Sequence, residues 1–103
     1  MVGVYMKLPR FLLVFGDKIK LRIKDLPYGV AAQYDIDKKI ITLSPIHETD
    51  DGLLHSLLHE AGHSLFYRVS INQAVSFETH EFIVNNYATM LLENFDIKPK
   101  LKK

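Results

Sequence analysis

The chain has 103 residues, no cysteine and a formal net charge of +1 at pH 7, and 48% of its residues are hydrophobic. This length suits one domain over residues 1–103, and the balanced charge offers no field to attract nucleic acid or an anionic membrane. Without cysteine there is no disulfide and no thiolate ligand, so any metal site must use nitrogen and oxygen donors.

The N-terminal region carries no recognisable export signal. Its apolar run, residues 11–15, is short for the core of a signal peptide, ends at Gly16 and lacks a small-residue cleavage site. No stretch approaches the roughly 20 apolar residues of a membrane-spanning helix. We therefore expect a cytoplasmic protein without a membrane partner, and the sequence leaves the role of residues 1–16 open.

Three strands are predicted in the first half of the chain. Residues 18–24, KIKLRIK, alternate between apolar and basic side chains with the period of a half-buried strand. Residues 29–34 and 40–44 flank the polar turn 35–39, a pattern typical of a hairpin. These segments predict a small three-stranded sheet.

Two helices are predicted in the second half. The first runs from about residue 51 to about residue 69 after N-cap candidates at residues 49–51, and the second from about residue 77 to residue 94. The expected core stripes are Leu54, Leu58, Ala61 and Leu65 on the first helix, and Phe77, Val84, Ala88, Leu91 and Phe95 on the second. The fold class is thus α+β, with a core over about residues 18–95 and a solvated basic tail at residues 97–103.

The first predicted helix contains the motif His59-Glu60-Ala61-Gly62-His63, an H-E-x-x-H. On a helix the two histidines lie one turn apart and can converge on one metal ion, while Glu60 lies beside them where it can polarise a metal-bound water. Gly62 lowers helix propensity by about 1 kcal/mol relative to alanine. Its presence predicts a close backbone neighbour, which we expect to be the hairpin strand.

The motif needs a third ligand, and the second predicted helix offers Glu78, His80 and Glu81. Glu78 projects to the polar side of the helix, which leaves the other two. Glu81 projects into the expected apolar stripe, where a buried carboxylate requires a partner such as a metal ion. His80 borders the same stripe, and imidazole is an equally good zinc donor. Glu81 is the preferred third ligand, with His80 as the alternative.

The segment LLHEAGHSLF, followed by HEFIVNNYATMLLENF, resembles the short zincin-type metallopeptidases of phages and mobile elements, which are related to the ImmA/IrrE-like family. In that family a strand, an H-E-x-x-H helix and a later helix with E-x-x-x-(N)-x-(aromatic)-A and Leu-Leu recur in this order. The later motif here reads Glu81, Asn85, Tyr87, Ala88, Leu91 and Leu92. The resemblance covers about residues 18–95 and also implies Glu81 as a metal ligand.

The expected activity is zinc-dependent hydrolysis of a peptide bond in a peptide or protein substrate. Zn²⁺ on His59, His63 and Glu81 would keep one position for water, and Glu60 would act as general base and then protonate the leaving amine. We expect the strand over residues 40–44 to be the sheet edge along which an extended peptide lies.

Two other functions compete with this one. A non-catalytic, zinc-stabilised interaction or regulatory domain that binds a host or phage protein would keep the ligands, although such a site has no need of Glu60. A metal-free nucleic-acid-binding module is disfavoured by the near-neutral charge and the lack of a basic helix face. The sequence defines neither the substrate, nor the metal loaded in the cell, nor the oligomeric state.

Overall fold

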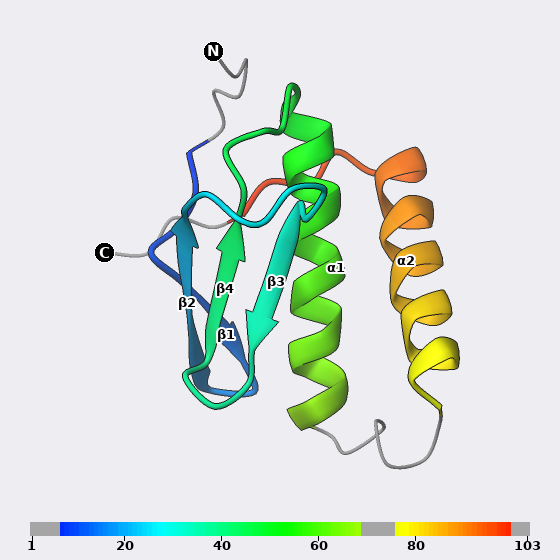
Figure 1. Ribbon diagram of the computed structural model, residues 1–103. Helices are drawn as coiled ribbons and strands as arrows, with labels where there is room; N and C mark the ends of the chain where they lie inside the picture. Colours follow the sequence, from blue (N-terminus) through cyan, green and yellow to red (C-terminus); the bar gives the residue numbers. More distant parts are fainter. Residues whose placement is uncertain (1–6, 69–75, 100–103) are drawn as a thin grey trace.

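A computed structural model describes residues 7–68 and 76–99. Along the chain its elements are β1 (Phe11–Val14), β2 (Asp17–Ile23), β3 (Ala32–Asp35), β4 (Ile40–Leu43), α1 (Asp50–Arg68) and α2 (Phe77–Asn94). Figure 1 shows the sheet on one side of α1 and α2 on the other. The α+β class is confirmed. The expected end of the first helix at Val69 and the tail beyond residue 99 lie outside the described residues.

The described part of the chain forms a sheet of four strands, so the prediction of three strands was wrong. The additional strand, β1, pairs antiparallel with β2 through Leu12 opposite Ile19. Phe15 and Gly16 join the two strands with φ angles of 49° and 85°, as in the two-residue turns that suit the twist of a hairpin. Phenylalanine rarely adopts positive φ, so the Phe15 position in this turn was not expected, although Gly16 and Asp17 after an apolar run are themselves a turn signal.

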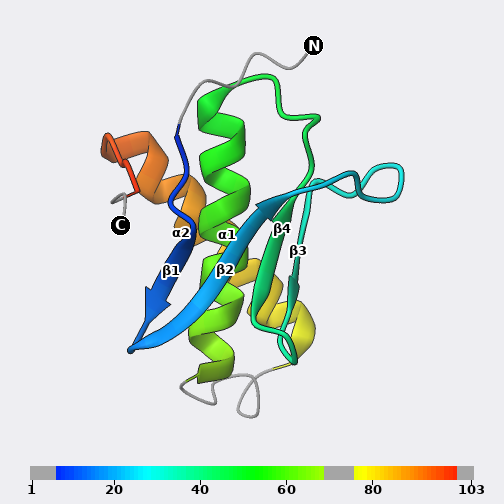
Figure 2. The same cartoon turned by 90° about the vertical axis from the view of Figure 1, so that its left-hand side faces the viewer.

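The strand order is β1-β2-β4-β3, with β2 and β4 parallel and β3 and β4 antiparallel. The predicted hairpin over residues 29–44 is therefore present, and Figure 2 shows its two strands beside β2. However, β4 lies inside the sheet between two partners, so it cannot be the edge that we expected to receive a peptide. In the described residues the two edges of the sheet are β1 and β3, and β3 is the one that lies beside the H-E-x-x-H segment.

One face of the sheet packs against α1 and forms the hydrophobic core. Ile41 and Leu43 of β4 are fully buried, and Leu53 and Leu57 of α1 are 2% exposed each. The expected stripe on α1 was partly wrong, because Leu65 is 39% exposed. This helix has neighbours on two sides, the sheet and α2, and its buried residues are accordingly Leu53, Leu54, Leu57, His63 and Ser64.

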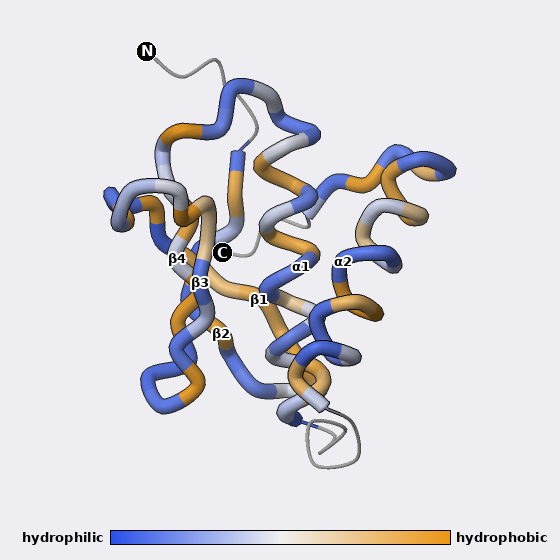
Figure 3. Tube along the Cα trace, turned by 45° about the vertical axis from the view of Figure 1, so that its right-hand side comes forward, coloured by the Kyte–Doolittle hydropathy of each residue, from blue (hydrophilic) through white to orange (hydrophobic). Residues whose placement is uncertain are grey.

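The second helix packs against α1 and buries a narrow stripe of three residues, His80, Val84 and Ala88. The predicted stripe was too wide, since Phe77 and Phe95 are 66% and 59% exposed. Hydrophobic and hydrophilic segments alternate along α2 in Figure 3, as expected for a helix with one neighbour. Within the described residues, neither helix combines the length and apolar character needed to cross a membrane.

Gly62 lies where α1 and α2 approach each other. A Cβ atom at this position would lie 2.9 Å from Cγ1 of Val84. The close neighbour is therefore α2 and not the hairpin strand, which corrects the prediction from the sequence. The absence of a side chain at Gly62 lets α2 come close to the H-E-x-x-H segment.

We expect Gly62→Ala to destabilise the protein. Alanine improves helix propensity by about 1 kcal/mol, but overpacking against the stiff Val84 side chain costs about 1–3 kcal/mol. In a Val84→Ala background the same Gly62→Ala change should become stabilising. Denaturant unfolding of the four proteins in this cycle measures the coupling, and strictly additive effects would contradict a steric contact between these two positions.

Candidate metal centre

The helix α1 is held on the sheet by the packing of its buried Leu53 and Leu57, and contacts at its two ends add to this. At the N-terminus the side chain of Thr49 accepts a hydrogen bond from the Gly52 amide at 3.0 Å, and Asp50 and Asp51 lie in the first turn, where negative charge is favourable. At the other end Nε of Arg68 lies 3.2 Å from Oδ2 of Asp17 in β2. The central turns of α1 are thereby fixed relative to the sheet.

A buried histidine that the sequence analysis did not single out joins the preceding loop to the same helix. Nδ1 of His47 lies 2.8 Å from the carbonyl oxygen of Ser44, and its Nε2 lies 2.8 Å from Oγ of Ser56. With Nδ1 protonated, His47 donates to Ser44 and accepts from Ser56. The loop between β4 and α1 is therefore attached one turn before Glu60.

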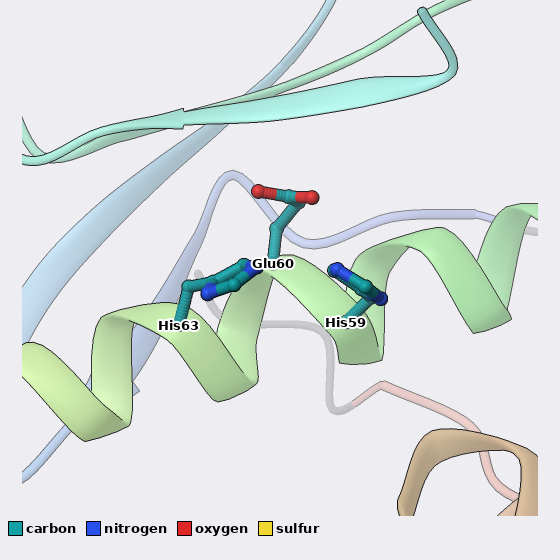
Figure 4. Close-up of side chains that lie close together, drawn as sticks. All are labelled: His59, Glu60 and His63. Carbon is teal, nitrogen blue, oxygen red and sulfur yellow. The ribbon is translucent and has the colours of Figure 1, made fainter. Parts of the chain in front are cut away.

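His59, Glu60 and His63 project from neighbouring positions on α1, as Figure 4 shows. One potential ligand atom of each lies within 4.8 Å of the others, so the group could hold a metal ion. In the same picture the Glu60 carboxylate rises from the helix on the side that faces the hairpin, above the two imidazole rings. This orientation leaves the space beside the rings to another donor.

The side chain that lies there is Glu81 of α2. Its Oε1 lies 2.5 Å from Nε2 of His63 and 3.4 Å from Nε2 of His59, so one carboxylate oxygen contacts both imidazoles. The Glu81 side chain is 39% exposed, and the expectation that it lies within the buried stripe was wrong. The structure nevertheless brings together the three residues that the sequence analysis selected as ligands.

The three donors fit a zinc ion in chemistry, and two of the distances between their ligand atoms can be compared with a zinc site. In the described residues, the group whose ligand atoms all lie within 4.8 Å of one another is His59, Glu60 and His63, without Glu81. Bond lengths of about 2.0–2.2 Å place the ligand atoms of a tetrahedral zinc site about 3.3 Å apart. The distance from His59 Nε2 to Glu81 Oε1, 3.4 Å, matches this spacing. The corresponding distance to His63, 2.5 Å, is that of a direct hydrogen bond, so an ion would require the Glu81 carboxylate to move outward by about 0.8 Å.

His80, the alternative ligand, lies behind His63. Its side chain is among the most buried in the described residues, at 1% exposure, and its Nε2 lies 2.9 Å from Nδ1 of His63. The ring stacks on Phe66 with 4.6 Å between centroids. His80 therefore contacts the nitrogen of His63 that faces away from Glu81, and this position favours Glu81 as the third donor.

Burial shifts the protonation of the group in the direction that metal binding requires. Burial lowers the pKa of His63, although Glu81 opposes this, and burial also lowers the pKa of His55 and His80. These imidazoles stay neutral to lower pH than usual, and a neutral ring nitrogen is the form that binds a metal. Burial, with a further contribution from Glu81, raises the pKa of Glu60, although His59 opposes the shift. A raised pKa suits a general base.

The metal-free protein should lose stability as the pH falls through about 6.5. Folding lowers the pKa of His55, His63 and His80, so on acidification these histidines bind protons in the unfolded chain at a higher pH than in the folded protein. Lowering the pH below the ordinary pKa of histidine therefore favours the unfolded state. Folding raises the pKa of Glu60, so protonation of this residue on acidification stabilises the folded protein. Stability should therefore fall more steeply with pH in Glu60→Gln, which lacks this contribution. Calorimetry in chelator at several pH values measures it, and a melting temperature that rises on acidification would contradict this account.

A cavity of about 550 Å³ opens beside the donor group. It lies between the hairpin strand β3, the H-E-x-x-H segment of α1 and the start of α2. Its lining includes Gln33 and Tyr34 of β3, Glu60 and Tyr67 of α1, and Glu81. Tyr87 does not line this cavity and lines a separate apolar hollow between α1 and α2. The carboxylate of Glu60 therefore faces a space that is bounded by the edge strand.

No protein-family model, curated protein or solved structure matches this chain. The group formed by His59, Glu60, His63 and Glu81 is the feature of the described residues from which a function can be inferred.

Proposed function

We propose that the protein is a zinc-dependent metallopeptidase. The observation that carries this proposal is the position of Glu81, whose Oε1 contacts Nε2 of His59 and Nε2 of His63 from a different helix. Two imidazoles and one carboxylate are a ligand set of catalytic zinc sites, which keep a further position for water or substrate. Glu60 lies beside these three ligands and is not itself one of them. This is the position that a general base occupies.

A zinc ion on these three residues would supply Lewis acidity toward water and toward the oxygen of the scissile carbonyl. The protein's own contribution to the reaction is Glu60. Its carboxylate accepts a proton as the oxygen of water forms a bond to the carbonyl carbon. It then delivers that proton to the amide nitrogen as the carbon–nitrogen bond breaks, which releases a carboxylic acid and an amine; the acid then gives its proton to the amine. Partial burial raises the pKa of Glu60, which favours its acceptance of the proton from water.

The substrate we propose is an extended peptide segment that lies beside β3. In the described residues this strand is hydrogen-bonded to β4 on one side and forms the edge of the sheet on the other. Residues 31–34 line the same cavity as Glu60 and Glu81. A peptide added to this edge would satisfy its backbone through strand pairing and pass in front of the H-E-x-x-H segment.

Cleavage of a peptide mixture by the zinc-loaded protein tests the proposal. A proteome-derived peptide library is incubated with the protein, and new termini are identified by mass spectrometry. We expect a defined set of cleavage sites that disappears when a chelator removes the metal and returns when zinc is restored. If the zinc-loaded protein cleaves no peptide and no unfolded protein, while it binds a protein partner, the interaction-domain alternative replaces this proposal.

A further inference from the structure

His80 is a buried, polar residue to which the proposed reaction assigns no part. Its ring is 1% exposed and lies in the first turn of α2, where its amide donates a hydrogen bond to the carbonyl of Ser76 at 2.9 Å. Ser76 caps this helix by accepting a hydrogen bond from the Thr79 amide. The backbone that carries His80 is thus fixed by the helix start itself.

Aromatic rings hold the side chain of His80 from several sides. Phe66 stacks on it with 4.6 Å between centroids and an interplanar angle of 21°, and Tyr67 meets it edge-on at 5.7 Å. Phe77 lies at 6.5 Å. The only side-chain hydrogen bond shown for the ring in the described residues joins its Nε2 to Nδ1 of His63 at 2.9 Å. Because His80 is buried, this hydrogen bond is costly to lose.

Zinc binding imposes a definite proton arrangement on this pair. His63 presents Nε2 toward Glu81, so a metal ion in the proposed site must take the lone pair of that nitrogen. The proton of the neutral His63 ring must then reside on Nδ1. Nδ1–H of His63 can only donate to His80 if Nε2 of His80 is an unprotonated acceptor. His80 must therefore be neutral, with its own proton on Nδ1.

We propose that His80 is a positioning residue that orients the His63 ring and stabilises its Nδ1-protonated tautomer for metal binding. This inference rests on the proposed zinc site and concerns the strength with which His63 binds the ion. Outer partners of metal-bound histidines are commonly carboxylates or carbonyl oxygens. A histidine in this place accepts the same hydrogen bond without adding a negative charge to the buried side of the site.

Zinc affinity measured by competition with a chromophoric chelator tests the role of His80. His80→Phe keeps an aromatic ring but has no acceptor, and we expect it to weaken zinc binding by about 10–100-fold. His80→Gln places an amide oxygen near the position of Nε2, and it should restore most of the affinity. The matched control is His47→Phe, which removes another buried, hydrogen-bonded histidine; it should lower the melting temperature without a comparable change in zinc affinity.

A spectroscopic measurement separates positioning from mere packing. In the zinc-loaded protein with ¹⁵N-labelled histidine, NMR should show His80 as the neutral tautomer with the proton on Nδ1, and His63 with its proton on Nδ1 as well. Circular dichroism and the melting temperature of each metal-free variant report whether it folds. If His80→Phe does not fold, the Gln variant and the NMR spectrum of the unaltered protein still decide the question.

The outcomes separate failure of this inference from failure of the proposed function. If the unaltered protein binds no zinc, the metal site itself is wrong. Equal zinc affinity of the unaltered protein and a folded His80→Phe would overturn the positioning role alone. So would an Nε2-protonated His80 in the zinc-loaded protein. If His80→Phe and His80→Gln both lose zinc completely while Glu81→Ala retains it, His80 is a ligand and not a positioning residue.

Discussion

Glu60→Gln should lose peptide hydrolysis by about 10²–10⁴-fold while it keeps both the zinc ion and the fold. Glutamine is nearly isosteric, but its amide cannot accept the proton from water. The same variant should have a higher melting temperature at neutral pH. Burial raises the pKa of Glu60, which means that the folded protein disfavours the charged carboxylate, and this cost is present once the pH exceeds that pKa. Hydrolysis of an identified substrate, zinc content and thermal unfolding are measured together.

The matched control is Glu93→Gln, which makes the same chemical change at an exposed position of α2. It should leave hydrolysis unchanged. Opposite effects on activity and stability in Glu60→Gln are expected for a catalytic carboxylate and not for a structural one. If Glu60→Gln, fully loaded with zinc, cleaves as fast as the unaltered protein, Glu60 is not the general base.

Glu81→Ala should remove zinc binding almost completely. An oxygen of Glu81 contacts both imidazoles, and losing a direct ligand should cost far more than the about 10–100-fold typical of an outer partner. His59→Ala should have a similar effect. Zinc stoichiometry after dialysis, determined by elemental analysis, measures the loss. Thermal unfolding with and without zinc should show stabilisation by the metal in the unaltered protein and none in Glu81→Ala.

Glu78→Ala provides the control for this experiment, because Glu78 lies on the same helix, is exposed and does not line the cavity. It should bind zinc as the unaltered protein does. Retention of one tightly bound zinc ion by Glu81→Ala would place the third ligand elsewhere, with His80 as the next candidate.

Much of the fold could be predicted because the relevant patterns are local. Alternation in KIKLRIK indicated β2, and the polar turn between two apolar segments indicated the β3–β4 hairpin. The H-E-x-x-H spacing placed two imidazoles on one face of a helix, and the structure brings them to Glu81. Glu81 was selected because it was expected to lie in the buried stripe of α2. That premise was wrong, since the stripe passes through His80, but Glu81 does contact both histidines.

The features that could not be predicted depend on contacts between distant segments. The parallel pairing of β2 with β4 moves β3 to the sheet edge, and no pattern within either strand encodes that order. The close neighbour of Gly62 is Val84, which lies on another helix. His80 could have been recognised from its spacing, because His80, Val84 and Ala88 lie one turn apart and so occupy one face of a helix.

X-ray absorption at the zinc edge tests the central claim most directly, because it reports the atoms that surround the ion. The zinc-loaded protein should show two imidazole nitrogens and low-atomic-number oxygen donors at about 2.0–2.2 Å. Glu81→Ala and His59→Ala serve as controls, because after dialysis each should retain too little zinc to give this signal. A first shell with three imidazoles, or one without any imidazole, would contradict a zinc centre formed by His59, His63 and Glu81.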